Sequence, residues 1–367
     1  MGQQMAAGHG ARAGVVVSPR ERMTILPQTL ATLFATIPAD VPVSVVTGDL
    51  PPGITAALRQ LLAARPFRLM ACAGLILPNA ARNLAAAGME TDFILFLDDD
   101  VALSPGALEA LAGALETTGA DAAAPLCLLG PKSPPVIHHA GGSLGLVPQA
   151  GGGAPAIHEV HHLMNAPLSQ EADRMAAAGV QPNEVCEFHC MLMRKALWDR
   201  MGGFDERLVT REHVDLALRM ACLDARAVFV PQAVVTYLAL EPLLSGDLDY
   251  FLFRWSDRFV AASMDAIEDT WGLPADRAAV HDGFIRGHRA RAIATALPAL
   301  RRGVDEATFR SRIVPAVEAD HARRTQALAD ALPRPLVPPR PDRDRAAAVL
   351  AALAARSGPA AAEPTHV

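Results

Sequence analysis

The sequence predicts an α/β fold with a mostly parallel sheet flanked by helices, followed by a helical C-terminal appendage. Two observations support this prediction. Short apolar, β-branched runs alternate with segments of helical periodicity through the first hundred residues. Elements that alternate in this way form a parallel sheet with helices on both of its faces. The 367 residues are enough for one large domain with an appendage.

The elements follow in order along the chain. Strands are expected where short apolar runs end at turn residues, at 13–18, 41–49, 67–73 and 93–100. Helices are expected between them where leucines and alanines recur at helical spacing, at 24–37, 54–64 and 79–89. Parallel sheets of this kind bind ligands beyond the carboxyl ends of their strands, so that edge is where a functional site is expected.

The fourth strand ends in three consecutive aspartates, Asp98, Asp99 and Asp100. Side chains two residues apart in an extended segment point the same way, so Asp98 and Asp100 share one side. Two carboxylates at the carboxyl end of a strand suit a hard divalent cation, Mg²⁺ or Mn²⁺. The alternative is that the aspartates only end the strand, before a helix capped by Ser104 with Pro105 at its first position.

Composition and charge argue against several classes of protein. A net charge of −6 gives no broad attraction for nucleic acid or for an anionic membrane surface. Five cysteines without framework spacing favour reduced thiols. No secretory signal is recognised, and no apolar run reaches the roughly 18 to 20 residues of a membrane-spanning helix. We therefore expect a cytoplasmic protein that could still associate peripherally with the inner face of the membrane.

Four segments, in this order, resemble the inverting nucleotide-sugar transferases of glycosyltransferase family 2, which have the Rossmann-like GT-A fold. They are VVVSPRERMTILPQTLATL, NAARNLAAAGMETDFILFLDDDVALSPGALEAL, VIHHAGGSLG and CMLMRKALWDRMGGFDERLVTREHVDLALRM. Their order and spacing are more specific than any one motif. The resemblance implies a transferase domain over residues 1–240.

Beyond residue 240 the resemblance thins and the composition changes. Helical periodicity predicts a helical region over 241–332, with Trp255 and Phe259 on its core face. The Pro-rich and Ala-rich composition of 333–367 predicts a disordered tail.

The resemblance implies transfer of a sugar from a nucleoside-diphosphate sugar to a hydroxyl of a glycan or lipid-linked glycan, in cell-surface polysaccharide or glycoconjugate synthesis. Asp98 and Asp100 would hold the cation that bridges the donor diphosphate, and Asp99 would lie near the ribose or the sugar. Nucleotide contacts are implied for residues after the first strand and in the Ala-Arg-Asn segment: Pro19, Arg20, Glu21 and Arg82. Asp49 lies two residues beyond the place of the family's base-reading Asp and is a candidate for that contact.

The acceptor-side block must supply a general base that takes the proton of the attacking hydroxyl. His213 stands where the family carries the base Asp, which leaves three interpretations open. Glu212 is the base, His213 is the base with a pKa suited to neutral pH, or transfer activity has been lost. Glu212 is the preferred candidate. Asp215 and Arg219, four residues apart on a predicted helix, are interpreted as a surface ion pair.

Other features depart from the family pattern or suggest different chemistry. Tyr237 occupies the place where many relatives carry a metal-contacting His. The segment CEFHC at 186–190 lacks the paired spacing of a zinc site, and His189 is expected in the acceptor pocket. The histidines of 158–162 are expected in a mobile loop, and GGSLG at 141–145 as a flexible connection.

Two other functions remain open at the level of sequence. A nucleotidyltransferase would also use aspartates at a strand end, but the chain has no Gly-rich phosphate loop after its first strand. A non-catalytic relative that binds a nucleotide-sugar or a glycan is compatible with the departures at His213 and Tyr237.

Overall fold

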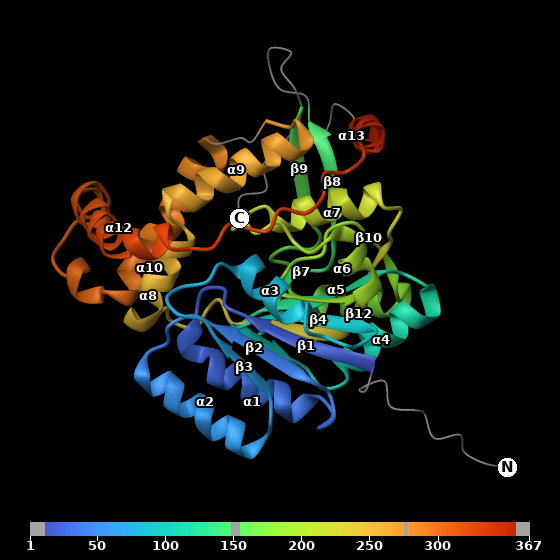
Figure 1. Cartoon of the computed structure of the whole chain (residues 1–367), viewed down its shortest axis with the longest axis horizontal. Coiled ribbons are helices and arrows are strands. Elements are labelled where there is room, and N and C mark those ends of the chain that lie inside the picture. Colours follow the sequence, from blue (N-terminus) through green and yellow to red (C-terminus); the bar gives the residue numbers. More distant parts are fainter. Residues whose placement is uncertain (1–11, 148–154, 275–277, 357–367) are drawn as a thin grey trace.

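Figure 1 shows the computed structural model of the chain, which describes residues 12–147, 155–274 and 278–356. A ten-stranded sheet forms its centre, in the order β10-β12-β6-β11-β4-β1-β2-β3, with β5 beside β12 and β7 beside β6. Its strands are β1 (Ala13–Ser18), β2 (Val43–Thr47), β3 (Arg68–Ala71), β4 (Phe93–Asp98), β5 (Val101–Leu103), β6 (Ala122–Leu129), β7 (Val136–His139), β10 (Gln181–Asn183), β11 (Cys190–Arg194) and β12 (Ala227–Tyr237).

The sheet is mostly parallel, as predicted. Strands β3, β2, β1 and β4 pair in parallel, and so do β6 and β12. Strand β11 lies antiparallel between β4 and β6, which keeps these two strands pointing in the same direction. The carboxyl ends of β1 and β4 therefore meet at one edge, where the sequence analysis placed the functional site.

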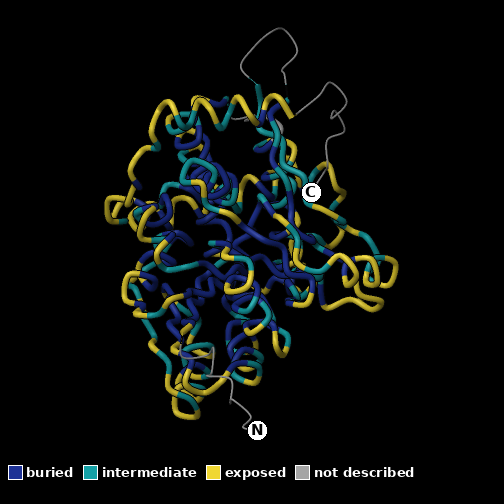
Figure 2. Tube along the Cα trace, turned by 90° about the vertical axis from the view of Figure 1, so that its right-hand side faces the viewer, coloured by how far each residue is buried: buried dark blue, intermediate teal, exposed yellow. Residues whose placement is uncertain are grey.

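Helices cover both faces of this sheet. The side chains of β4 alternate between two cores, Leu95 on one face and Phe96 on the other. One face is covered by α1 (Leu26–Thr36), α2 (Pro52–Ala64) and α4 (Ala107–Thr118), and the other by α3 (Pro78–Ala86), α6 (Lys195–Met201) and α7 (Glu212–Cys222). Figure 2 shows the resulting pattern, with buried residues in the middle of the molecule and exposed residues around it.

The predicted C-terminal helices form a group beside the sheet, with α8, α10 and α12 at the left of Figure 1 and α9 across its top. They are α8 (Ser245–Arg254), α9 (Asp257–Trp271), α10 (Arg286–Ala296), α11 (Glu306–Thr308) and α12 (Val314–Asp330), joined by short 3₁₀ and π segments. Trp255 and Phe259 are buried in the core that these helices share, as predicted. Among the described residues, no helix combines the length and the apolar character needed to cross a bilayer.

The predictions of a flexible connection at 141–145 and of a mobile loop at 158–162 are wrong, because these segments form a β-hairpin. Strand β8 (Gly142–Val147) pairs antiparallel with β9 (Ala156–His161), and the GGSLG segment runs into β8. Leu144 and Leu146 point to the same side of the strand and are buried in a core that includes residues of α7 and α9. This burial stabilises the strand despite its glycines.

A disordered tail was predicted for residues 333–367, but the structure differs from this prediction within 333–356, the part of the tail that it describes. Residues 343–356 form helix α13 (Arg343–Arg356), which packs against β8 and α7 through the buried Leu353. Asp342 accepts a hydrogen bond from the Arg345 N–H at the start of this helix. An isolated Ala-rich helix is marginal in water, so its packing against the core is what stabilises it. Residues 357–367 lie outside the described residues.

The helix after the three aspartates begins later than predicted. Gly106, with a φ of 79°, precedes the first residue of α4, which is Ala107. Ser104 and Pro105 form a turn instead of a cap, in which the Ser104 carbonyl accepts a hydrogen bond from the Ala107 N–H at 3.2 Å. The aspartates are thus followed by the short strand β5 rather than leading directly into a helix.

The substitution Phe96→Ala should destabilise the fold by about 3–5 kcal/mol, because it opens a cavity in the core. The Phe96 side chain is fully buried and packs edge-on against Phe204, with ring centroids 5.0 Å apart. Urea denaturation would measure the change in the free energy of unfolding. Leu84→Ala, at a side chain that is 42% exposed, should change it by less than about 0.5 kcal/mol. Equal losses in the two variants would contradict this assignment of the core.

Candidate functional site

The site lies where β1, β4 and β11 meet. Asp98 is the last residue of β4 and is paired in register with Ser18, the last residue of β1. Because β11 runs antiparallel to β4, His189 lies opposite Asp98, and its carbonyl accepts a hydrogen bond from the Asp98 N–H at 3.1 Å. The sheet register therefore brings a histidine to the aspartates.

Asp98, Asp100 and His189 form a group that could hold a metal ion. One donor atom from each of the three lies within 4.8 Å of the other two, and all three residues are buried. Asp98 Oδ2, Asp100 Oδ1 and His189 Nδ1 have no hydrogen-bond partner. Buried polar atoms rarely lack a hydrogen bond, so their occurrence in three residues that lie together indicates a ligand site. Two carboxylates and one imidazole fit a divalent cation such as Mn²⁺, as the sequence analysis expected for the aspartates.

The contribution of His189 to this group was missed by the sequence analysis, which expected it in the acceptor pocket. The Tyr237 ring, at the place of the family's metal-contacting histidine, stacks on His189 with ring centroids 4.0 Å apart. The Nε2 atoms of His138 and His189 lie 3.3 Å apart. Burial lowers the pKa of His138 to about 3, so this ring is neutral and its Nε2 can accept a hydrogen bond from His189 Nε2. That arrangement leaves His189 Nδ1 as the acceptor that faces the carboxylates.

Three arginines compensate the buried carboxylates. Arg82 Nη2 lies 2.7 Å from Asp98, Arg20 Nε lies 3.4 Å from Asp98, and Arg22 Nη1 lies 3.2 Å from Asp100. Burial alone would raise the pKa of Asp98, but Arg82 and Arg20 outweigh it and hold the pKa below its ordinary value. At Asp100 burial dominates and raises the pKa to about 6, although Arg22 opposes it. Asp98 is therefore the more firmly ionised of the two.

Arg82, which the resemblance implied as a nucleotide contact, is fully buried. Its Nη1 donates to Asn79 and its Nη2 to Asp98, and its guanidinium lies 4.2 Å from the centroid of the Phe188 ring. Both terminal nitrogens are thus engaged within the protein. The side chain holds Asp98 in place in this structure.

The other implied nucleotide contacts divide into two groups. The Arg20 N–H donates to Asp99 Oδ1 at 2.9 Å, and the Pro19 carbonyl accepts from the Tyr250 hydroxyl at 3.3 Å, so these residues adjoin the carboxylates. Burial, reinforced by the neighbouring Asp100, raises the pKa of Asp99 well above its usual value. Asp49, by contrast, is exposed to solvent.

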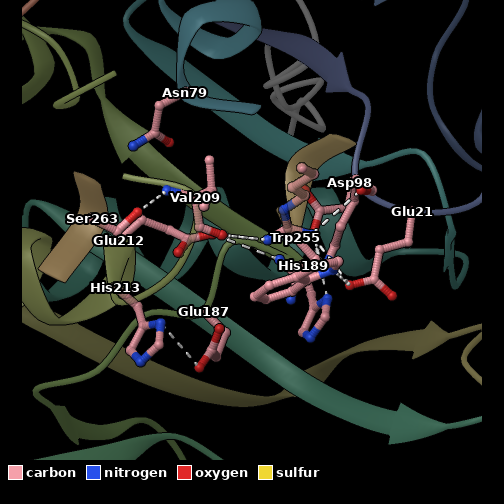
Figure 3. Close-up of polar contacts among 12 residues, drawn as sticks. Glu21, Asn79, Asp98, Glu187, His189, Val209, Glu212, His213, Trp255 and Ser263 are labelled. Carbon is pink, nitrogen blue, oxygen red and sulfur yellow. Dashed lines mark hydrogen bonds and ion pairs between the residues drawn. The ribbon is translucent and has the colours of Figure 1, made fainter. Parts of the chain in front are cut away.

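Glu21 is buried, and its carboxylate is hydrogen-bonded and ion-paired to residues of the C-terminal helical region. Arg254 Nη1 and Trp255 Nε1 donate to Glu21 Oε1 at 3.2 Å and 3.1 Å, and His288 Nε2 lies 3.5 Å from the same oxygen. Figure 3 shows Trp255 between Glu21 and the acceptor side of the site. The C-terminal helices are thus part of the site.

Glu212, the preferred candidate for the general base, is the first residue of α7 and is buried. Its Oε1 lies 3.4 Å from Arg254 Nη2 and 3.8 Å from Arg20 Nη1. The same Arg20 contacts Asp98, so one side chain links the candidate base to the metal group. The structure therefore brings the cation group at the aspartates and the candidate base on α7 together (Figure 3).

His213, the other candidate base, is paired with two carboxylates. Its Nε2 lies 2.7 Å from Glu159 Oε2 on β9, and its Nδ1 lies 3.6 Å from Glu187 Oε1. Burial lowers the pKa of His213, but Glu187 and Glu159 outweigh burial and raise it to about 9. At neutral pH the ring already carries its proton, which favours Glu212 as the group that accepts one.

The expected surface ion pair on α7 exists but is buried. Arg219 Nε lies 2.7 Å from Asp215 Oδ2, and Trp271 Nε1 donates to Asp215 Oδ1 at 2.9 Å. The prediction of surface exposure is wrong because α9 and the C-terminal segment cover α7, and Arg219 also donates to the Pro339 carbonyl.

Cysteine ligation has no support in the described part of the chain. Cys186 and Cys190 are buried free thiols, and burial raises the pKa of Cys186 to about 12. Neither of the two candidate metal groups among these residues includes a cysteine. Of the CEFHC segment, only His189 enters the metal group at the aspartates.

Residues 26–199 match the family model described as glycosyl transferase family 2. The matched segment contains all three residues of the metal group, Asp98, Asp100 and His189. An α/β sheet with this group at a strand end is found here within a segment that matches a glycosyltransferase model. Residues 26–199 are therefore a segment of the glycosyltransferase family 2 type, as the sequence resemblance implied.

Two solved structures illustrate what the chain is similar to. GalNAc-T7 with UDP, GalNAc and Mn²⁺ aligns over 85% of this chain and 58% of its own, with 12% identity and a TM-score of 0.49. The mannosyltransferase PcManGT from Pyrobaculum calidifontis, in complex with GDP-Man and Mn²⁺, aligns over 88% of both chains, with 16% identity and a TM-score of 0.42. This chain thus spans somewhat more than half the length of GalNAc-T7. No curated protein gives a significant match.

The pairing of His213 predicts how stability changes with pH in the metal-free protein. The folded pKa of about 9 exceeds the unfolded value of about 6.5, so the contribution of His213 is fully present below pH 6.5 and is lost as the pH rises through 9. Glu159→Gln should lower the pKa of His213 and flatten this slope. NMR titration of the ring, with urea denaturation at both ends of the window, would measure the two effects.

The matched control is Glu90→Gln, which neutralises an exposed carboxylate. It should leave the titration of His213 unchanged. A His213 ring that titrates near 6.5 in the otherwise native protein would contradict the pairing.

Proposed function

We propose that this protein transfers a sugar from a nucleoside-diphosphate sugar to an acceptor hydroxyl with inversion at the anomeric carbon, using Mg²⁺ or Mn²⁺. One observation carries the proposal. Three buried residues, Asp98, Asp100 and His189, place donor atoms within 4.8 Å of one another at the carboxyl end of β4 within the family segment, and each has a buried polar atom that makes no hydrogen bond. A dedicated cation site at this edge is what a reaction with a diphosphate leaving group requires.

The donor half of the site is built from the cation ligands and the arginines around them. A bound cation would neutralise the charge that develops on the diphosphate. Arg20 and Arg22 carry positive charge at the same edge, each within 3.4 Å of an aspartate of the group. Asp99 is proposed to lie near the ribose or the sugar. The donor nucleotide is proposed to lie near Pro19, Glu21, Asp49 and Arg82. Of these, Arg82 acts indirectly, by holding Asp98 in place.

Glu212 is proposed as the general base. As the acceptor oxygen attacks the anomeric carbon, its proton passes to the Glu212 carboxylate and the bond between that carbon and the diphosphate oxygen breaks. The Glu212 carboxylate lies 3.4 Å from Arg254 and 3.8 Å from Arg20, so it is held at the point where β1, α7 and α8 meet. His213 adjoins it at the start of α7, on the acceptor side.

The acceptor is proposed to be a glycan or a lipid-linked glycan in cell-surface polysaccharide or glycoconjugate synthesis, as the family resemblance implies. The polar character of the acceptor side supports a hydroxyl-rich substrate, since Glu159, Glu187 and His161 gather beside His213.

Nucleoside diphosphates should raise the melting temperature of the protein only in the presence of the cation. A ligand at 100 times its dissociation constant stabilises the folded state by about 2.7 kcal/mol. A panel of UDP, GDP, CDP and dTDP, each with and without Mn²⁺, would identify the base. The double variant Asp98→Asn with Asp100→Asn should lose the effect, and release of nucleoside diphosphate from the matching sugar donor should fall by at least a hundredfold.

Asp92→Asn is the matched control, because this carboxylate lies at the other end of β4 and is exposed. It should behave as the wild type in both assays. If no nucleotide shifts the melting temperature, or if the double variant shifts as the wild type does, the donor site is not at these aspartates. Stabilisation without any transfer to an acceptor would instead identify a protein that only binds the nucleotide-sugar.

A further inference from the structure

A second group of candidate metal ligands lies on the acceptor side, apart from Asp98 and Asp100. Glu159, His161 and His213 each place one donor atom within 4.8 Å of the other two. Glu159 and His161 are two residues apart on β9 and therefore point to the same side of the hairpin. His213 is the second residue of α7. The group thus joins two elements that are 52 or more residues apart in the sequence.

Glu187 completes this cluster from the loop before β11. Its Oε1 lies 2.9 Å from His161 Nε2 and 3.6 Å from His213 Nδ1, and its side chain is only 8% exposed. Figure 3 shows Glu187 and His213 facing each other below Glu212. The cluster therefore consists of two imidazoles and two carboxylates in a partly enclosed space.

One nitrogen of this cluster has a carboxylate as its ion-pair partner at a short distance, but without hydrogen-bond geometry. His161 Nε2 is buried and makes no hydrogen bond, although Glu187 Oε1 is 2.9 Å away, and the His161 side chain is 10% exposed. Two ligands of one tetrahedral cation with bonds near 2 Å lie roughly 3.3 Å apart without pointing at each other. A short distance between nitrogen and oxygen without hydrogen-bond geometry is therefore what two ligands of a shared cation would show.

The same groups also have an explanation without a metal. Arg211 Nη1 lies 3.0 Å from Glu159, and His213 pairs with Glu159 at 2.7 Å, so positive charges already balance the carboxylates. That explanation accounts for Glu159 and His213. The ion pair between His161 Nε2 and Glu187 Oε1 at 2.9 Å extends this explanation to the second carboxylate, so a metal-binding test has to separate the two explanations.

We propose that Glu159, His161 and His213, with Glu187 beside them, form a second cation site that takes Zn²⁺ or a similar transition metal. Two imidazole nitrogens favour such ions over Mg²⁺ and Ca²⁺, which prefer oxygen ligands. The site differs from the donor site in its chemistry, since the donor group has one imidazole and two aspartates. The bound ion holds β9 against the first turn of α7, next to the candidate base, so it fixes the acceptor side of the enzyme.

This inference goes beyond the proposed function and does not depend on it. The test uses the full chain, free of any histidine tag and stripped of metal, with Asp98→Asn and Asp100→Asn introduced to remove the donor site. We expect this protein to bind one equivalent of Zn²⁺ by calorimetry against a competing chelator. Co²⁺ should give the visible absorption of a low-symmetry site with nitrogen ligands.

Two further substitutions, each added to the same background, test the ligands. His161→Gln removes the nitrogen ligand while keeping a hydrogen-bond donor for Glu187, and Glu159→Gln removes one carboxylate. Each should weaken Zn²⁺ binding at least tenfold and abolish the Co²⁺ absorption. The matched control is His158→Ala, on the same strand but the opposite side, which should bind as the background protein does.

The melting temperature in the presence of a chelator separates loss of a ligand from loss of the fold. Weakened binding in variants that melt as the background protein does supports the site. If the background protein binds no Zn²⁺, or if His161→Gln and Glu159→Gln bind it as tightly as His158→Ala does, the cluster is a set of ion pairs only and the proposal is overturned. Neither result affects the donor-site test, which depends on nucleotides and on Asp98 and Asp100.

Discussion

The structure depends on the burial of three consecutive carboxylates at the end of a central strand. Isolated charges are costly to bury, so Asp98, Asp99 and Asp100 require partners from other elements. Arg82 comes from α3, and Arg20 and Arg22 come from the loop after β1. The positions of α3 and of this loop are therefore set by the charge at the end of β4. Asp98 Oδ2 and Asp100 Oδ1 still make no hydrogen bond, and both belong to residues of the candidate cation site.

The charge compensation continues into the C-terminal helices. Arg22 Nη2 donates to the Ala239 carbonyl, and Arg254 on α8 contacts both Glu21 and Glu212. Glu21 lies beside the donor residues and Glu212 is the candidate base, so a single buried guanidinium connects the two. This is why helices that follow the matched family segment belong to the same site. Their packing fixes charged groups as well as covering apolar surface.

Local patterns in the sequence were sufficient to predict the strands and helices of the first hundred residues. The apolar runs before Ser18 and Asp98 are continuous, and the helices between them have clear periodicity, so the strand ends and the paired carboxylates could be predicted. His189 could not be predicted as their neighbour, because its place depends on β11 running antiparallel beside β4. The burial of Glu21 and Asp215 was also missed, since the helices that cover them come from distant parts of the chain. Strand β8 was not predicted because of its glycines, and it is stabilised by tertiary packing of its two leucines.

The extended segment before α13 crosses the outer side of the acceptor region. The Glu206 N–H donates to the Leu336 carbonyl, the Leu336 N–H donates to the Glu206 side chain, and Arg219 on α7 donates to the Pro339 carbonyl. The helix that carries Glu212 and His213 is thus fastened by residues more than a hundred positions later in the chain. Local opening free energies follow such cooperative units. Fluctuations that release the last described helix would therefore also loosen the acceptor side, while the strands around the aspartates would stay closed.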